Sequence, residues 1–141
     1  MFSLIDNIYA SKGLYQEILA PVCKKHDLTE SALTILLYLA EDNDKDTASD
    51  IIKDQRLKKS LVSVSIKELL SRGLISKVAS DSNRRMKHLV VNDSAREIVK
   101  EAQKQRDSYY AILMQGFDKQ EKQDLRSYLM RINENINRHK T

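Results

Sequence analysis

Apolar residues recur every three or four positions along most of the chain, and this spacing predicts a mainly helical protein. A first long helix is predicted over about residues 2–25, although Gly13 and Pro21 weaken it locally. A second helix, with Thr29 as its N-cap, is predicted to end near residue 41. The apolar face of this second helix consists of Leu33, Leu36, Leu37 and Ala40.

The middle of the chain predicts two further helices and a hairpin. Thr47 and Asp50 have the spacing of a capping box, which favours a short third helix starting there. A fourth helix is predicted over about residues 59–72, and a glycine directly after it marks its end. Two short β-prone segments, 74–78 and 87–91, flank a polar loop and predict a hairpin. A hairpin this small is not stable alone, so it must pack on the helices.

Two more helices are predicted in the last third of the chain. Asn92 or Asp93 can cap a long fifth helix, and Asp118 with Glu121 forms a capping-box pair for the last one. The apolar stripes are Ile98, Val99, Ala102, Tyr109, Ile112 and Leu113 in the fifth helix, and Leu125, Leu129, Ile132 and Ile136 in the last. These terminal helices carry more apolar surface than a small domain can cover, which favours association with a second chain.

Composition narrows the class of protein. With 141 residues, 41% of them hydrophobic, the chain can form one domain with a real core and appended helices. Three glycines and one proline exclude collagen-like and turn-rich all-β designs. The single cysteine excludes a disulfide framework and fits a reducing, cytoplasmic location. No apolar run is long enough to span a membrane, so no membrane partner is expected.

Catalytic and metal-binding patterns are missing from the sequence. There is no phosphate loop, no nucleophile elbow and no His-Glu zinc motif, so we expect no enzymatic activity and no cofactor. The three histidines are scattered without metal-ligand spacing, so no metal site is expected either.

The charge is concentrated in the middle of the chain. Residues 45–89 contain eleven basic and five acidic side chains, whereas residues 27–44 contain five acidic and no basic ones. A basic segment between neutral or acidic flanks is what a polyanion-binding surface needs. The alternative is a solvated surface whose charge is merely uneven.

The predicted order of elements is typical of a winged helix-turn-helix. In that arrangement the second helix of the pair enters the DNA major groove, and the basic hairpin reaches the neighbouring backbone or minor groove. The face of the fourth helix opposite its apolar residues, its N-terminus and the hairpin loop therefore hold the candidate DNA contacts. They are Lys58, Lys59, Ser60, Ser63, Val64, Lys67, Asn83, Arg84, Arg85 and Lys87.

Two motifs give the chain a specific resemblance. The segments KSLVS (59–63) and LLSRGLI (69–75) resemble the start of the recognition helix and the approach to the wing in the MarR/SlyA family of bacterial transcription regulators. The opening of the last helix, GFDxxE (116–121), is also similar to that family. The hairpin loop departs from the family pattern, with Ser82 where an arginine is usual and Asn83 where an aspartate is common.

The resemblance implies a homodimeric regulator, by analogy a repressor, on a pseudo-palindromic operator. It implies an N-terminal dimerisation helix (1–27), a winged helix-turn-helix DNA-binding part (28–92) and C-terminal dimerisation helices (93–141). A two-fold dimer presents its recognition helices about one DNA turn apart, roughly 34 Å. A small ligand that favours the wrong spacing between these helices would release the DNA.

Four alternatives stay open at the level of sequence. The winged helix could dock a partner protein and not DNA. Cys23 could be a redox sensor, with Lys24, Lys25 and His26 lowering its pKa, or a buried and inert thiol. Aromatic side chains could line a pocket for a small aromatic or phenolic ligand, or pack in the core; these are Tyr9, Tyr15 and Tyr38. In the hairpin loop, one of the two arginines could bridge Asp81 and stiffen the wing.

Overall fold

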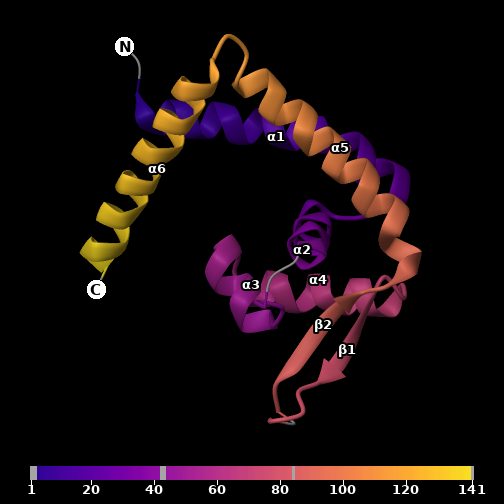
Figure 1. Ribbon diagram of the computed structural model, residues 1–141. Coiled ribbons are helices and arrows are strands. Elements are labelled where there is room, and N and C mark those ends of the chain that lie inside the picture. The colour runs from indigo at the N-terminus through magenta and orange to yellow at the C-terminus, as the bar shows by residue number, and fades with distance from the viewer. Residues whose placement is uncertain (1–2, 42–43, 84, 141) are drawn as a thin grey trace. The chain divides into compact units, whose positions relative to one another are not determined.

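Six helices and one hairpin follow one another along the chain in the computed structural model, which describes residues 3–41, 44–83 and 85–140 (Figure 1). The elements are α1 (Leu4–His26), α2 (Glu30–Ala40), α3 (Ala48–Gln55), α4 (Lys59–Ser71), β1 (Ile75–Ala79), β2 (Lys87–Val91), a 3₁₀ turn (Asp93–Ala95), α5 (Arg96–Leu113) and α6 (Lys119–Lys140). Packing divides the chain into two compact units, residues 1–109 and 110–141. The fold is mainly α, as the sequence predicts.

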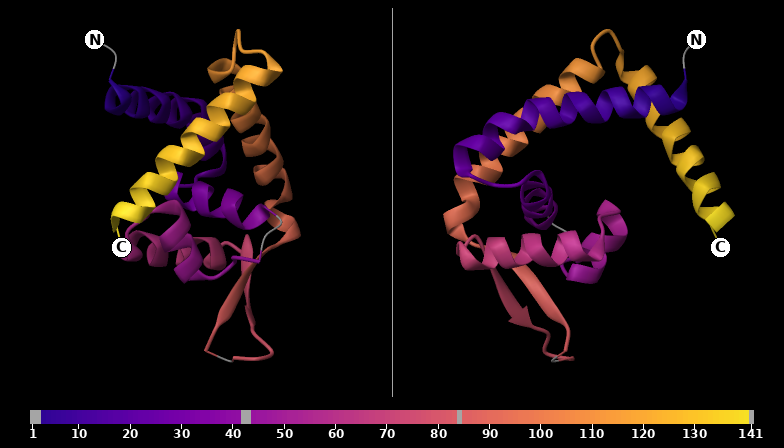
Figure 2. Two further views of the ribbon diagram at one scale, coloured as in Figure 1. Left: turned by 60° about the vertical axis from the view of Figure 1, so that its left-hand side comes forward. Right: turned by 180° about the vertical axis from the view of Figure 1, so that it is seen from behind.

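The predicted elements are all found, with small shifts at their ends. Helix α1 continues through Pro21 to His26. The first strand begins one residue later than predicted, and the two strands pair antiparallel, with Ile75 opposite Val91 and Ala79 opposite Lys87. In the two further views the hairpin projects away from α3 and α4 (Figure 2).

The predicted capping boxes are confirmed. In α3, the Thr47 hydroxyl accepts from the Asp50 backbone N–H, and the Asp50 carboxylate accepts from the Thr47 N–H, both at 3.2 Å. In α6, Asp118 and Glu121 make the same reciprocal pair, at 2.8 and 3.0 Å. Each pair satisfies backbone donors that have no partner within the helix.

The start of α5 differs from the prediction. A 3₁₀ turn comes first, and the Asn92 side chain makes no capping hydrogen bond there. The Asn92 side chain instead accepts from the Ser76 hydroxyl at 2.8 Å and donates to the Gly73 carbonyl at 2.9 Å. Asn92 therefore ties the base of the hairpin to the turn that leads into α5. The reason is tertiary: the segment that contains Gly73 and Ser76, at least 16 residues earlier in the chain, takes both hydrogen bonds of the Asn92 amide.

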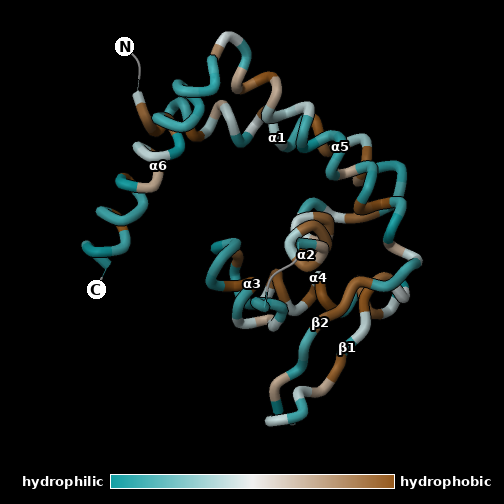
Figure 3. The backbone as a smooth tube through the Cα atoms, in the orientation of Figure 1, coloured by the Kyte–Doolittle hydropathy of each residue, from teal (hydrophilic) through white to brown (hydrophobic). Residues whose placement is uncertain are grey.

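The core of the first unit is built around α2. Six of its eleven residues are buried, and they are Ala32, Leu33, Ile35, Leu36, Leu37 and Tyr38. Ile35 and Tyr38 lie outside the predicted apolar face, whereas Ala40, which was placed on it, is half-buried. Burial extends around the helix because its neighbours cover more than one side of it. Figure 3 shows hydrophobic residues gathered on α2, while the tip of the hairpin is hydrophilic.

Several apolar residues of the terminal helices are exposed. Leu4, Ile5, Ile8 and Tyr9 on the first turns of α1 are 50 to 70% exposed. In the second unit, no described residue of α6 is buried, although the predicted stripe is present. Of the residues predicted to form the stripe of α5, Ile112 is 51% exposed. Among the described residues, no helix is both long and apolar enough to cross a membrane.

Candidate nucleic-acid interface

The helix pair α3–α4 is joined by a three-residue turn. Arg56 ends α3 in the left-handed conformation, with φ of 53°, and Lys58 directly precedes the first turn of α4. Ile51 of α3 and Val62 of α4 are almost fully buried and anchor the two helices on α2. This turn fixes the direction in which α4 leaves α3.

Helix α4 is amphipathic in the way the sequence predicts. Val62, Ile66 and Leu69 are buried, and Leu70 is half-buried. The opposite face, formed by Ser60, Ser63, Val64 and Lys67, is exposed throughout, and Val64 is 64% exposed. Lys58 and Lys59 are exposed at the N-terminus, where the Lys58 side chain makes no cap hydrogen bond. Free backbone N–H groups and two ammonium groups make this end attractive to anions.

A groove of about 860 Å³ joins this face of α4 to the hairpin. Ser63 and Lys67 line it from α4, and Asn83, Arg85 and Lys87 line it from the hairpin. Five candidate DNA contacts are thus brought to one concave surface from segments about twenty residues apart. Its floor is apolar, formed by Ile66, Leu70, Met86 and Leu89.

Two basic residues of the groove were not among the predicted contacts. Lys77 lies on β1, and Lys45 lies in the segment before α3. Asp44 and Asp50 also line the groove, so its lining is mainly basic and includes two carboxylates. The signal for Lys77 was available in the sequence, because it lies in a strand that pairs with the one starting at Lys87. Lys45 could not be placed without knowing how the α2–α3 segment folds.

The hairpin loop is organised by Asn83. Its side-chain carbonyl accepts from the Arg85 backbone N–H at 3.1 Å, and its backbone carbonyl accepts from the Met86 N–H at 3.1 Å. Asn83 therefore shapes the loop that presents Arg85. Within the described residues, no ion pair joins Asp81 to Arg85. Arg84, the remaining predicted contact of the loop, lies outside the described residues.

The hairpin is also tied to the segment before α3. The His88 ring and the Asp46 carboxylate form a close ion pair, and the Leu89 N–H donates to the Asp46 carbonyl at 2.9 Å. These contacts hold β2 next to the start of the helix pair. The hairpin is thus attached to the segment before α3 through the middle of β2.

The three tyrosines proposed for a ligand pocket have different surroundings. The Tyr15 ring packs edge-on against Tyr109 with centroids 5.0 Å apart. Tyr38 is buried and donates to the Asp54 carboxylate at 2.8 Å, and its burial, with this bond, raises the pKa of its phenol. Tyr9 is 70% exposed. The structure therefore gives these residues packing contacts and does not gather them around one cavity.

Cys23 has surroundings that oppose a reactive thiol. It is half-buried at the edge of the core, and burial raises the pKa of the thiol, with a further increase from the charge of Glu30. The expected effect of the neighbouring cations is not found. Lys25 and His26 are both paired with Glu101, at 2.7 and 3.0 Å. The described residues also contain no cluster of three or more His, Cys, Asp or Glu side chains that could hold a metal ion.

Comparison with known proteins shows a family likeness for the helix pair and the first strand of the hairpin. Residues 26–86 match the model of the MarR family. The matched segment runs from the end of α1 into the hairpin loop, so it contains α2, α3, α4 and β1. This part of the chain is therefore similar to the MarR family. A search of curated proteins finds no significant match to this chain.

Solved structures share the fold over almost the whole length. A MarR-family regulator from Listeria monocytogenes, solved with a 26mer DNA, has a TM-score of 0.84 and 20% identity, covering 96% of this chain and 90% of that one. The regulator SlyA gives a TM-score of 0.82 at 18% identity, over 96% and 94%. The S. aureus MepR–DNA complex gives 0.77 at 18%, over 96% and 99%. At these identities the likeness establishes the fold.

Proposed function

We propose that this chain is a sequence-specific, DNA-binding transcriptional regulator of the MarR family. The observation that carries the proposal is the groove that joins the exposed face of α4 to the basic hairpin, while the other face of α4 is locked in the core. An α-helix fits the major groove, where each base pair presents its own pattern of donors and acceptors. The solved structures that share this fold include DNA complexes, among them those of the Listeria monocytogenes regulator and of S. aureus MepR.

The proposed contacts divide into two kinds. Affinity comes mainly from phosphate contacts by the cations at the start of α4 and in the wing, which are Lys58, Lys59, Arg84, Arg85 and Lys87. Specificity comes from the face formed by Ser60, Ser63, Val64 and Lys67, where the Val64 side chain can contact a thymine methyl group. Asn83 acts at the wing tip, where it also holds the loop.

The acting species is proposed to be a homodimer. Apolar side chains are exposed on the first turns of α1 and along α6, and exposed apolar surfaces of this kind are expected to be covered by a partner. Helix 1–27 and helices 93–141 would form the interface, and the part between them would bind DNA. A two-fold dimer needs a pseudo-palindromic operator. By analogy with the MarR/SlyA family, the dimer is proposed to act as a repressor that a small ligand releases from DNA.

The proposal is tested by the salt dependence of binding to duplex DNA. Arg85→Ala should weaken binding and should lower the slope of log K against log salt by about 1.8, because each of two subunits loses a phosphate contact worth about 0.9. The matched control is Lys122→Ala, which removes an exposed cation from α6 and should leave the slope unchanged. An equal slope of log K against log salt for the parent and for Arg85→Ala would contradict a phosphate contact by the wing. If the chain does not bind duplex DNA and instead binds a partner protein in a way that is insensitive to salt, a protein-docking module is favoured.

A further inference from the structure

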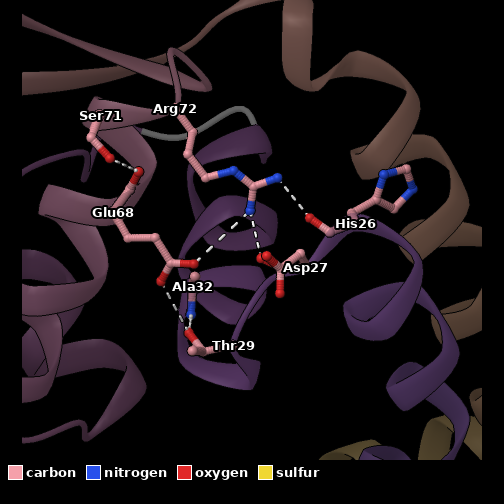
Figure 4. Close-up of polar contacts among 7 residues, drawn as sticks. All are labelled: His26, Asp27, Thr29, Ala32, Glu68, Ser71 and Arg72. Atoms are coloured by element: carbon pink, nitrogen blue, oxygen red, sulfur yellow. Dashed lines mark hydrogen bonds and ion pairs between the residues drawn. The ribbon is translucent and has the colours of Figure 1, made fainter.

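The last turn of α1 is held by a residue at the far end of α4 (Figure 4). The Arg72 guanidinium donates from Nη1 to the Asp27 carbonyl and from Nη2 to the His26 carbonyl, both at 2.6 Å. A planar guanidinium is suited to bridging two neighbouring oxygens in this way, because its donors are arranged as a rigid fork. The two helices are therefore joined at a defined angle and not merely packed.

The carbonyls that Arg72 binds are left over from the ending of α1. Leu28 donates to the Cys23 carbonyl at 2.9 Å and Asp27 donates to the Lys24 carbonyl at 3.4 Å, which is the pattern of a left-handed helix end. Asp27 itself has φ of 51°. The carbonyls of His26 and Asp27 come after those used by the turn, and the Arg72 cation also complements the negative end of the α1 dipole.

A second contact lies one turn earlier on α4. The Glu68 carboxylate is 4.0 Å from Arg72 and accepts from the Thr29 hydroxyl at 3.5 Å. Thr29 in turn caps α2, accepting from the Ala32 N–H at 3.1 Å. The C-terminal end of α4 is therefore attached both to the end of α1 and to the start of α2, and two attachment points on one rigid helix define its direction.

The proposed DNA-reading face lies on the other part of the same helix. Ser60 is twelve residues before Arg72, which corresponds to about 18 Å along a helix axis. A tilt of about 10° at the Arg72 end would move Ser60 by about 3 Å, which is enough to break hydrogen bonds to base edges. The end of α1 is held from another side by Glu101 of α5, which binds Lys25 and His26.

We propose that Arg72 is a positioning residue, whose fork on the His26 and Asp27 carbonyls sets the direction of the recognition helix α4 relative to α1. The guanidinium touches no DNA; it acts through the placement of α4. In its consequence for DNA the inference rests on the proposed function, but the placement itself can be measured without DNA.

The DNA-free experiment measures the distance between α1 and α4. Spin labels are attached at Glu17→Cys and Val64→Cys, both exposed, in a Cys23→Ser background, and labelled chains are diluted with unlabelled protein. We expect one narrow distance distribution for the parent and a broader or shifted one for Arg72→Ala. Arg72→Lys keeps the charge but replaces the rigid planar fork by a single flexible ammonium group, so it should be intermediate. Arg96→Ala, which breaks an exposed pair with Asp93 at 2.7 Å, is the matched control and should resemble the parent.

An unchanged distribution for Arg72→Ala would overturn the proposal. A parent-like distance distribution for Arg72→Lys would also overturn it, because the rigid fork of the guanidinium would then not be needed to set the direction of α4. If Arg72→Ala does not fold, the lysine variant decides the question by itself.

The DNA experiment measures affinity and its salt dependence. Arg72→Ala should bind a cognate duplex about tenfold more weakly, because fewer molecules present α4 in the competent direction. Its salt slope should equal that of the parent, and its preference for one half-site spacing should relax. A slope lower by about 1.8 would make Arg72 a phosphate ligand and would overturn the positioning role. If the parent binds no DNA, the proposed function fails, while the distance measurement still decides the role of Arg72.

Discussion

Cys23 illustrates how the chemistry of a residue depends on what surrounds it. Basic residues follow it directly in sequence, and proximity to cations normally lowers a thiol pKa. In the folded chain Lys25 and His26 are paired with Glu101, and burial of the thiol raises its pKa instead. A raised pKa leaves less thiolate at neutral pH, and the thiolate is the form that oxidants attack.

Cys23 is therefore predicted to react slowly. Iodoacetamide should alkylate the folded protein more slowly than the urea-unfolded protein at the same pH, with the difference shrinking only at alkaline pH. Peroxide should change DNA binding equally in the parent and in Cys23→Ser. A peroxide-induced loss of binding that Cys23→Ser abolishes would establish a redox sensor.

The sequence predicts some residue environments well and others not at all. The two faces of α4 follow from a helical period, so the burial of Val62 and the exposure of Ser63 could be predicted. The partner of a polar side chain depends on segments far away in sequence. That is why the roles of Asn92 at the hairpin base and of Tyr38 beside Asp54 were not predictable.

At the scale of elements, local sequence signals predict where helices start and end. Capping boxes and the glycine after α4 depend on a few adjacent residues, and the structure confirms them. Burial of an entire helix does not depend on its own sequence pattern alone. Helix α2 is surrounded by its neighbours, so its buried residues go beyond the predicted face.

The left-handed residue after α4 can be tested by comparing substitutions at two glycines. Gly73 follows the end of α4 and adopts the left-handed conformation, with φ of +70°. Its backbone N–H donates to the Leu70 carbonyl at 3.0 Å. A Cβ there would meet no atom within 4 Å, so Gly73→Ala should lower the free energy of unfolding by about 1–2 kcal/mol through backbone strain alone.

Gly13 is the matched control, because it lies inside α1 and an added Cβ also meets no atom within 4 Å. Gly13→Ala should raise the free energy of unfolding by about 0.5–1 kcal/mol. Urea unfolding at one fixed protein concentration measures both effects. Equal effects of the two substitutions would contradict the assignment of Gly73 to a left-handed helix end.

Glu101 gives a test of the contact between α1 and α5. Hydrogen bonds from Lys25 and His26 lower the pKa of the Glu101 carboxyl below its ordinary value. A lowered pKa in the folded state means that the stabilisation is present above the ordinary value, and is lost as the pH falls through the folded-state pKa. The same contact raises the pKa of Lys25. It is therefore lost at the alkaline end only when Lys25 gives up its proton, at strongly alkaline pH.

Glu101→Gln should therefore melt at a lower temperature than the parent at about pH 7, and the difference should disappear as the pH falls through the folded-state pKa of Glu101. Glu17→Gln, on an exposed residue of α1, is the control and should follow the parent throughout. A difference in melting temperature that persists in acid would mean that the ion pairs do not carry the effect.

At the scale of the whole molecule, the exposed apolar residues of the terminal helices predict a dimer. Ile8 on α1 is 50% exposed and Leu129 on α6 is 51% exposed, so neither substitution should disturb the fold of one chain. Ile8→Glu or Leu129→Glu should dissociate the dimer, because a charge would be buried at the interface. Val90→Glu, on an exposed apolar residue of the hairpin, should leave the dimer intact.

Sedimentation at micromolar concentration distinguishes these species. A monomeric parent would contradict the dimer. A parent dimer that both terminal-helix variants leave unchanged would move the interface elsewhere.

In the proposed dimer, two copies of the basic groove read a two-fold DNA site. Selection of the protein against a random duplex pool, followed by sequencing, tests this reading of DNA. We expect a pseudo-palindromic consensus with half-sites about ten base pairs apart, and loss of enrichment for Arg85→Ala. No enrichment by a folded, dimeric parent would contradict it.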